Sequence, residues 1–327
     1  MHLQKNIGYW LLAGLAMMLT EACRKDVHEF VPYTPVGEDL NALLQQVPEI
    51  NIQATFRFEG TGAPLADTIL TLPAGVRLHL SHADALFENE NGVPVPCSTC
   101  PDLQINTAFT ARKGEAIALQ LSQLTYPEGY VLESAGLLRV EASCAGQRLR
   151  LRPGSALKVQ IPVVSPKNNM ALFTAQTAGD GKLLGWKDGS LPALPVLWSS
   201  TVSGALQSGY EISLPQMGWV NCARVLPEAS SPLCVALPNQ FTALNSRVFL
   251  VFQNTNTVVE LSGSVASSRF CLQRAPIGYP VHVIAVARTG QQHWIAETST
   301  EIGTNTQLSL WPKPVTQQDI VSLLKKL

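Results

Sequence analysis

The chain has 327 residues and carries 23 Lys and Arg against 24 Asp and Glu, for a formal net charge of −1. Without a basic surplus it cannot neutralise a phosphate backbone, so the composition argues against a nucleic-acid-binding protein. Only 14% of the residues are charged and 46% are hydrophobic, which excludes a disordered chain and is typical of a β-rich exported protein.

Residues 1–22 have the organisation of a lipoprotein signal peptide. Lys5 supplies a positive start, and the apolar run over 7–19 is shorter than the roughly 20 residues that span a bilayer. Ala22 is the small residue expected before a cleavage site, and Cys23 would become the lipidated first residue of the mature chain. The two residues before Ala22 depart from the usual lipobox. An ordinary secretory signal with a chance cysteine is therefore the alternative.

Residues 23–49 are expected to form a tether with one short helix. Asp39 is a suitable N-cap, and Pro48 ends a helix that begins there. A lipidated Cys23 followed closely by Lys25 and acidic residues resembles the export signal of Bacteroidota surface lipoproteins. Several acyl chains on one cysteine give stable membrane attachment. We therefore expect a lipid anchor in the outer membrane, with the protein facing the cell exterior.

From Ile50 onward, apolar and polar residues alternate with the period of a β-strand. The alternation is clear over 50–57, 148–152 and 157–161, and turn pairs such as Pro153-Gly154 separate such stretches. Many short strands with this punctuation predict antiparallel sandwiches. The composition changes near residue 192. The expected fold class is all-β: two antiparallel β-sandwich-type domains, at 50–192 and 193–327, with a short C-terminal helix.

The second half is expected to contain strands at 247–253, 281–286 and 294–297. Residues 249–252 are apolar on both faces, which predicts a strand in the centre of a sheet. Thr316 and Asp319 form a variant capping box for the final helix. Its apolar face should pack on the second domain. That face comprises Ile320, Leu323, Leu324 and Leu327.

An even number of cysteines in an exported protein predicts disulfides. Those after Cys23 are Cys97, Cys100, Cys144, Cys222, Cys234 and Cys271. Six cysteines allow 15 connectivities. Short spacing favours Cys97–Cys100 and Cys222–Cys234, which leaves the other two to pair across the domains or to remain as buried thiols.

The Cys97–Cys100 spacing also allows a redox or zinc site. Prolines bracket the pair, no helix signal follows, and the sequence has no second such pair to complete a zinc site. His79 would face outward from a strand at 76–80, and His82 would fall in the next turn, so the two need not converge. We expect no metal and no cofactor.

No hydrolase, metalloprotease or phosphate-binding motif is present, so we expect no enzyme. Tryptophans could instead stack on sugar rings. Trp294 and Trp311 are the candidates for such ligand stacking, because we expect both to be exposed. Trp219 is expected to pack at the start of a strand.

An ordered series of short motifs carries a family resemblance. The motifs lie at 70–75, 90–95, 132–142, 146–151, 153–154, 161–162, 170–173, 186, 218–222, 248–252 and 276–278. Together they resemble a family of uncharacterised Bacteroidota outer-membrane lipoproteins, and the first half is loosely similar to the ZU5-type β-sandwich. The resemblance implies an architecture and a location but no activity. The chain departs from the pattern at Cys97–Cys100 and in the stretch around Cys234.

These observations predict a non-catalytic, lipid-anchored cell-surface protein with a structural or adhesive role, or one that binds another envelope protein. A glycan-binding accessory lipoprotein is the alternative. A row of exposed aromatics on one sheet face would favour the glycan, a cleft with converging titratable groups would favour an enzyme, and exposed edge strands would favour a protein partner. The expected contacts are the membrane, an envelope protein and, in the alternative, a glycan.

Overall fold

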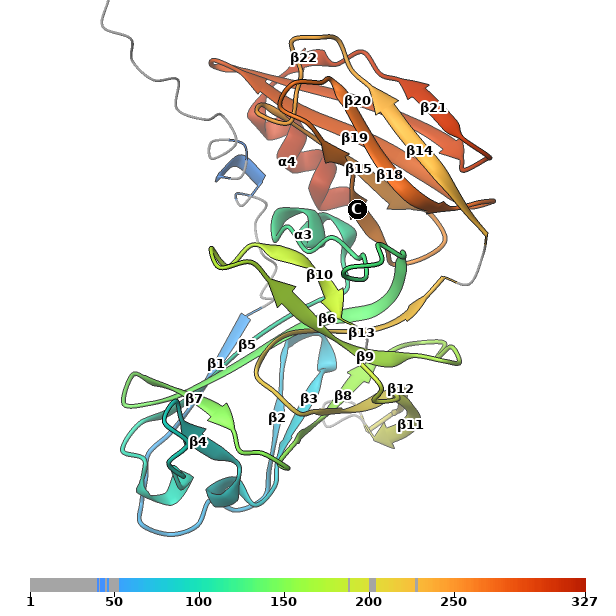
Figure 1. Ribbon diagram of the computed structural model, residues 1–327. Coiled ribbons are helices and arrows are strands. Elements are labelled where there is room, and N and C mark those ends of the chain that lie inside the picture. The colour runs from blue at the N-terminus through green and yellow to red at the C-terminus, as the bar shows by residue number, and fades with distance from the viewer. Residues whose placement is uncertain are drawn as a thin grey trace, which may run out of the picture. The chain divides into compact units, whose positions relative to one another are not determined.

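The computed structural model describes residues 40, 42–44, 46, 53–187, 189–199, 204–226 and 229–327. The predicted signal peptide, Cys23 and most of the tether lie outside these residues. The fold is all-β and of the sandwich type, with a short C-terminal helix, as the sequence predicts (Figure 1). The sheets are antiparallel apart from the pairing of residues 233–236 with residues 306–309, which is parallel. No helix in the described part of the chain is long and apolar enough to cross a membrane.

The first sandwich pairs a large sheet with a smaller one. The eight-stranded sheet contains β1 (Gln53–Phe58), β5 (Leu103–Thr110), β6 (Leu132–Cys144), β13 (Gly218–Val225), β9 (Ala171–Thr177) and β10 (Leu183–Lys187). In addition, β7 (Gln147–Leu151) pairs with β6, and β4 (Phe87–Asn89) pairs with β7. The five-stranded sheet runs in the order β11 (Leu194–Ser199), β12 (Leu206–Leu214), β8 (Leu157–Pro162), β3 (Arg77–Leu80) and β2 (Thr68–Thr71). Alternate residues of both sheets, such as Val140 and Ile212, meet in one buried core.

Strand pairing continues across the domain boundary expected between residues 192 and 193. β11 and β12 extend the sheet of β8, and β13 lies between β6 and β9. Near the expected boundary the chain crosses from the eight-stranded sheet to the five-stranded sheet. Leu172 N donates to Leu191 O and Ala193 N donates to Met170 O, each at 2.9 Å, and Pro192 lies between these bonds.

The second sandwich begins after β13. Its four-stranded sheet has the order β17 (Ser262–Gly263), β18 (Arg269–Pro276), β14 (Ser230–Ala236) and β21 (Thr306–Ser309). Its five-stranded sheet has the order β16 (Val258–Glu260), β15 (Ser246–Phe252), β19 (Pro280–Thr289), β20 (Gln292–Glu301) and β22 (Lys313–Val315). The prediction of a central strand is confirmed: β15 lies between two neighbours, and Phe249 and Leu250 bury opposite faces of it.

The C-terminal helix α4 (Gln317–Lys326) starts with the predicted capping box. Asp319 N donates to Thr316 Oγ1 at 3.2 Å, and Thr316 N donates to an Asp319 carboxylate oxygen at 2.9 Å. Ile320 and Leu324 then bury against β15 and β19, as predicted.

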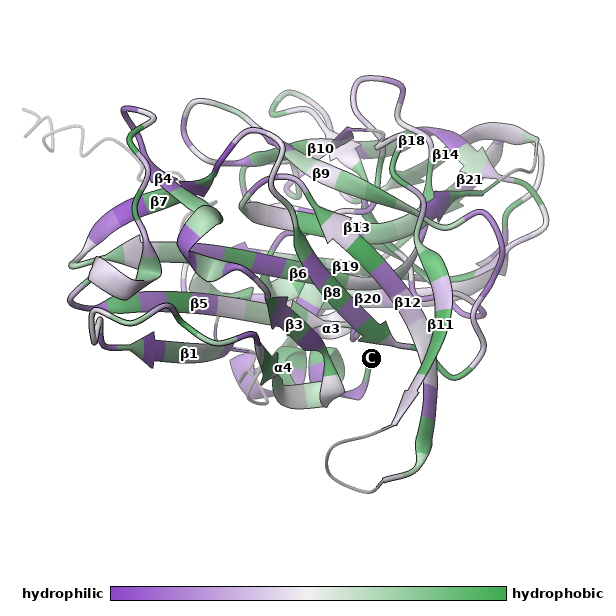
Figure 2. Ribbon diagram, turned by 90° about the horizontal axis from the view of Figure 1, so that it is seen from below, coloured by the Kyte–Doolittle hydropathy of each residue, from purple (hydrophilic) through white to green (hydrophobic). Residues whose placement is uncertain are grey.

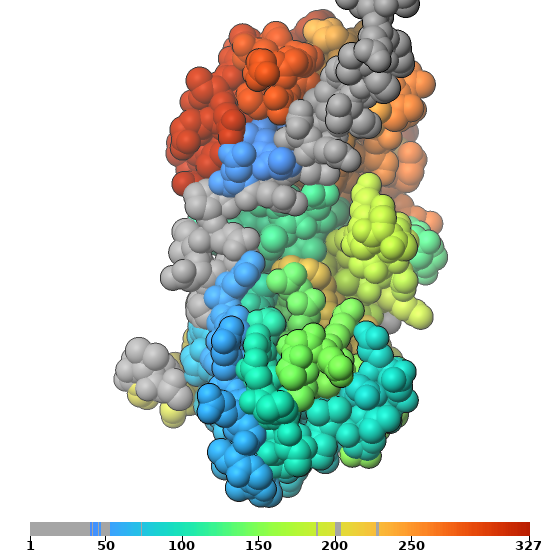
Figure 3. All heavy atoms as spheres, turned by 90° about the vertical axis from the view of Figure 1, so that its left-hand side faces the viewer, coloured from blue at the N-terminus to red at the C-terminus, as the bar shows by residue number. Residues whose placement is uncertain are grey.

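Two further segments cover the same sheet face as α4. One is the short helix α3 (Lys113–Ala118), and the other contains helical residues 40 and 42–44, which fall within the predicted tether helix. The buried leucines of the second segment pack in the cluster that α4 also joins; in Figure 3 its blue atoms lie beside the red C-terminal part. Gly114 makes the approach of α3 to α4 possible, since a Cβ there would stand 1.8 Å from Leu324 O.

The disulfides are Cys100–Cys144 and Cys234–Cys271, so both predicted local pairs are wrong. Cys234 and Cys271 are register partners on β14 and β18, and that relation is invisible in linear spacing. Cys222 instead points from β13 into the first core and is fully buried.

Candidate functional site

A group of exposed apolar side chains lies on the β11–β12 hairpin and the adjoining loop. Val164 is 95% exposed, Leu206 76% and Leu197 70%. We call these three residues the hairpin patch. The hairpin projects beyond the other strands of its sheet, and hydrophobic colour runs along β11 (Figure 2). Three such side chains close together differ from the scattered single apolar residues of an ordinary surface, which makes the patch a candidate interaction site.

The register of β11 explains why Leu197 is exposed. Trp198 turns to the outer face of the sheet, where its Cη2 would stand only 2.5 Å from a Cβ at position 209. Gly209 therefore provides the space that lets the indole bury. Because side chains alternate along a strand, Leu197 takes the opposite face, diagonally across from Leu206.

Two members of the patch border a groove. Val164 and Leu206 line a hollow of about 410 Å³, together with Ala74 and Pro162. The other face of β11 adds a further apolar side chain, Leu194, which is 54% exposed. The hairpin therefore offers apolar surface on both faces and a depression at its base.

β12 fixes the loop that carries Val164. Val163 N donates to Ser208 O at 2.9 Å, and Ser208 Oγ lies 2.7 Å from Val163 O and 3.2 Å from Val164 O. Two residues along β12, Tyr210 Oη accepts the N–H of Lys167 and donates to Lys167 O at 2.9 Å. Burial raises the pKa of Tyr210, which keeps it a neutral hydroxyl able to do both.

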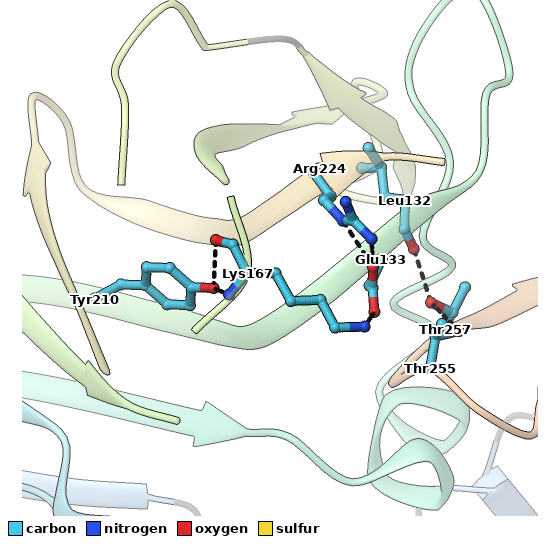
Figure 4. Close-up of polar contacts among 7 residues, drawn as sticks. All are labelled: Leu132, Glu133, Lys167, Tyr210, Arg224, Thr255 and Thr257. Carbon is cyan, nitrogen blue, oxygen red and sulfur yellow. Dashed lines mark hydrogen bonds and ion pairs between the residues drawn. The ribbon is translucent and has the colours of Figure 1, made fainter. Parts of the chain in front are cut away.

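An ion-pair cluster ties the same loop to the eight-stranded sheet (Figure 4). Glu133 on β6 receives the ammonium of Lys167 on one oxygen and the guanidinium of Arg224 on the other, at 2.7–2.8 Å. Glu133 and Arg224 are register partners on β6 and β13. The Glu133 side chain is only 5% exposed, and a carboxylate buried to that extent is stable only when paired.

The residue before Glu133 connects this cluster to the second sandwich. Thr257 Oγ1 donates to Leu132 O at 3.0 Å and receives a bond from Thr255 Oγ1 at 3.1 Å. Both oxygens of Glu133 are neutralised by cations, so the carboxylate is not available to take a proton from a substrate. The ion pairs of Glu133 therefore hold the loop that carries Val164 against the eight-stranded sheet.

The two predicted ligand-stacking tryptophans differ in their surroundings. Trp311 is 73% exposed, as predicted. The prediction that Trp294 is exposed is wrong, because the residue is half-buried: its ring meets Phe241 edge-on at 5.6 Å, and its Nε1 donates to Thr289 Oγ1 at 2.7 Å. The other well-exposed aromatics of the described chain, Tyr126 and Tyr130, precede β6. They form no row with Trp311 on one sheet face.

His79 lies in a strand and His82 in the turn after it, as predicted. The strand is β3, where His79 lies between buried leucines, and His82 occupies a left-handed position in the turn. No group of three His, Cys, Asp or Glu residues within the described ranges is arranged to hold a metal ion.

The two cysteines outside the disulfides are buried thiols. Cys97 lies in a 3-10 turn at Cys97–Thr99, and its Sγ contacts Ala83 O at 3.2 Å. Burial raises the pKa of Cys97 and of Cys222 to about 12. A thiol with that pKa is a poor nucleophile and metal ligand, so neither has the properties of a reactive cysteine.

One polar arrangement was missed by the sequence analysis. On β19 and β20, His282 Nδ1 lies 3.1 Å from Ser299 Oγ and His282 Nε2 lies 3.0 Å from Glu297 Oε2. These are the residue types of a hydrolase triad, but strand pairing alone brings them together. His282 and Glu297 are 26% and 48% exposed. We interpret them as a cross-strand polar ladder, which only the register reveals.

Comparison with known proteins adds no relative. No protein-family model, no curated protein and no solved structure matches this chain.

Proposed function

We propose that this protein is a non-catalytic, lipid-anchored component of the outer cell surface, which binds a protein partner through the β11–β12 hairpin. The hairpin patch is the observation that carries the proposal. Three strongly exposed apolar side chains on a projecting hairpin and its adjoining loop lower the solubility of a chain without a partner, and a binding surface accounts for them.

The position of β11 indicates the form of the partner. β11 is the last strand of its sheet, with β12 on one side only. Alternate N–H and C=O groups of such a strand point away from the sheet and can pair with an added strand. The partner we propose is an extended segment of another envelope protein, which adds along β11 and places apolar side chains against the patch.

Two lines of support concern the location. The N-terminal sequence has the order of a lipoprotein signal ending at Cys23, and the two disulfides are typical of an oxidising compartment. The resemblance to Bacteroidota outer-membrane lipoproteins agrees with both. Shaving intact cells with protease should degrade the protein if it faces outward; its survival would contradict the outer-face placement.

Site-specific photo-crosslinking on intact cells tests the binding surface. A photoreactive residue at position 197 should capture one recurrent envelope protein. The matched control places it at Leu184, an equally apolar side chain that is 44% exposed on β10. Capture of the same species from both positions, or no capture from position 197, would contradict the proposal.

A further inference from the structure

A second concave site lies away from the hairpin patch. It is a cleft of about 510 Å³ on the outer face of the eight-stranded sheet. Trp219 of β13 lines it from that sheet, and Asp180 and Lys182 line it from the turn between β9 and β10. Residues 119–122, after α3, and Glu260 of β16 line the remainder. The volume falls within the roughly 300–1,000 Å³ of small-ligand pockets.

The indole of Trp219 is held in place by its neighbour. Arg139 is its register partner on β6, and the guanidinium carbon lies 5.5 Å from the ring centroid. This cation–π contact restrains the ring, which also packs against the buried cluster that contains Phe173 and Trp186. Trp219 nevertheless remains partly exposed. A restrained, partly exposed indole in a cleft can stack on a flat apolar ligand face at little cost in side-chain entropy.

Polar groups with unused hydrogen-bonding capacity surround the indole. Glu260 N donates to Ser122 Oγ at 3.1 Å, and Glu260 Oε1 pairs with Arg247 at 3.2 Å. Within the described chain, Glu260 Oε2, the Lys182 ammonium and the Gln120 amide make no hydrogen bond or ion pair. Burial raises the pKa of Glu260, while the charges of Arg247 and Lys182 act to lower it. The cleft therefore contains a carboxyl acceptor, an ammonium donor and an amide.

The charge balance narrows the ligand class. Asp180 and Glu260 are offset by Lys182 and by the nearby Arg247, and Arg139 over the indole is offset by Glu141 at 4.0 Å. The cleft therefore favours neither an anion nor a cation. A neutral ring with hydroxyl groups on its edge and C–H groups on its face matches both the indole and the polar rim. We infer that the cleft at Trp219 binds a neutral saccharide unit, with its ring stacked on Trp219 and its hydroxyls bonded to Glu260, Lys182 and Gln120.

The test uses the full mature chain from Cys23, without its lipid, on an immobilised array of neutral and acidic oligosaccharides. We expect retention on a set of neutral glycans, with Kd then measured by isothermal titration calorimetry, which does not depend on the Trp219 fluorophore. Trp219→Ala should weaken binding at least tenfold, and Lys182→Ala should weaken it several-fold. Trp311→Ala is the matched control, because it removes an exposed indole outside the cleft and should leave Kd unchanged.

Several results would overturn the inference: no glycan retained, retention of acidic glycans alone, or wild-type affinity in a folded Trp219→Ala protein. If Trp219→Ala fails to fold, the glycan Kd of Lys182→Ala and of Gln120→Ala tests the site instead, since both change side chains at the rim of the cleft. Wild-type affinity in both would exclude the site. The saccharide site is independent of the proposed protein partner, so glycan binding does not depend on whether position 197 captures a protein.

Discussion

The Tyr210 hydroxyl bonds to both the N–H and the C=O of one residue, Lys167. A single buried side chain of β12 therefore holds the backbone of the loop that carries Val164. The sequence distance between the two residues is 43, so this loop is shaped by a long-range contact and not by its own turn residues. If the hairpin patch binds the proposed partner, this fixed loop would lower the entropic cost of association.

Replacing Tyr210 by Phe should lower the free energy of unfolding by about 1–3 kcal/mol, because it leaves both backbone groups of Lys167 without their partner. Urea denaturation measures this loss. Tyr126→Phe is the control, since Tyr126 is 42% exposed and its loss should cost almost nothing. Equal stability of the two variants would mean that the Tyr210 hydroxyl does not hold the loop.

Glu133→Gln should lower the free energy of unfolding by more than replacement of Tyr210 by Phe does. It removes the charge that neutralises Arg224 and Lys167, and breaking a buried ion pair from one side costs about 3–5 kcal/mol. Lys167→Met should cost under about 1 kcal/mol, because Lys167 is 48% exposed and can be solvated. Chemical denaturation of both variants, with Glu128→Gln as an exposed control, checks the order; a milder effect of Glu133→Gln than of Lys167→Met would contradict it.

Gly114→Ala tests the contact between α3 and α4. The added Cβ would stand 1.8 Å from Leu324 O, which is backbone and cannot rotate away, so the helices must separate. We expect a loss of about 1–3 kcal/mol and faster amide exchange in α4. Gly179→Ala is the control, because nothing lies within 4 Å of its Cβ. Unchanged exchange in α4 would show that the helices do not meet as described.

Local patterns in the sequence predict the local parts of this fold. The alternation at 157–161 yields β8, and Thr316 and Asp319 yield the capping box of α4, because each depends on residues close in the chain. The apolar run at 249–252 also predicts a central strand correctly, since a strand that is buried on both faces needs consecutive apolar residues.

Long-range pairing could not be predicted in the same way. Cys234 meets Cys271 through the register of β14 and β18, and linear spacing favoured the wrong partner. The candidate sites are also formed by contacts between residues far apart in the sequence. Trp219 joins Lys182 and Glu260 only because β13, β10 and β16 converge with the segment after α3, and no short motif records that convergence.

Alkylation of the native protein tests the thiol assignment. With a pKa of about 12, Cys97 and Cys222 are thiolates in only about one molecule in ten thousand at pH 8, and both are buried. Neither should react with iodoacetamide until the protein is unfolded. Mass spectrometry of the unreduced digest should then show the peptides of Cys100 and Cys144 linked. A linked Cys97–Cys100 peptide would contradict the structure.

Alkaline pH should lower the stability of the fold through the Cys222 thiol. The pKa of Cys222 rises from 9.0 to about 12 on burial, so above pH 9 the unfolded chain releases a proton that the native state retains. Stability from this group is therefore full below pH 9 and falls as the pH rises toward 12. Cys222→Ala should show a smaller drop in Tm between pH 8 and pH 10 than the wild type. Identical drops would mean that other groups dominate the alkaline loss.

Changes in the hairpin patch should separate binding from folding. Leu197→Lys and Leu206→Lys place a charge where the side chain is already 70% and 76% exposed, so the free energy of unfolding should change by less than about 0.5 kcal/mol. The same changes set a charge against an apolar partner surface and should reduce capture of that partner on cells, whereas Leu184→Lys on β10 should not. A loss of stability in Leu197→Lys would show that the patch packs within the chain, and its exposure would then need no partner.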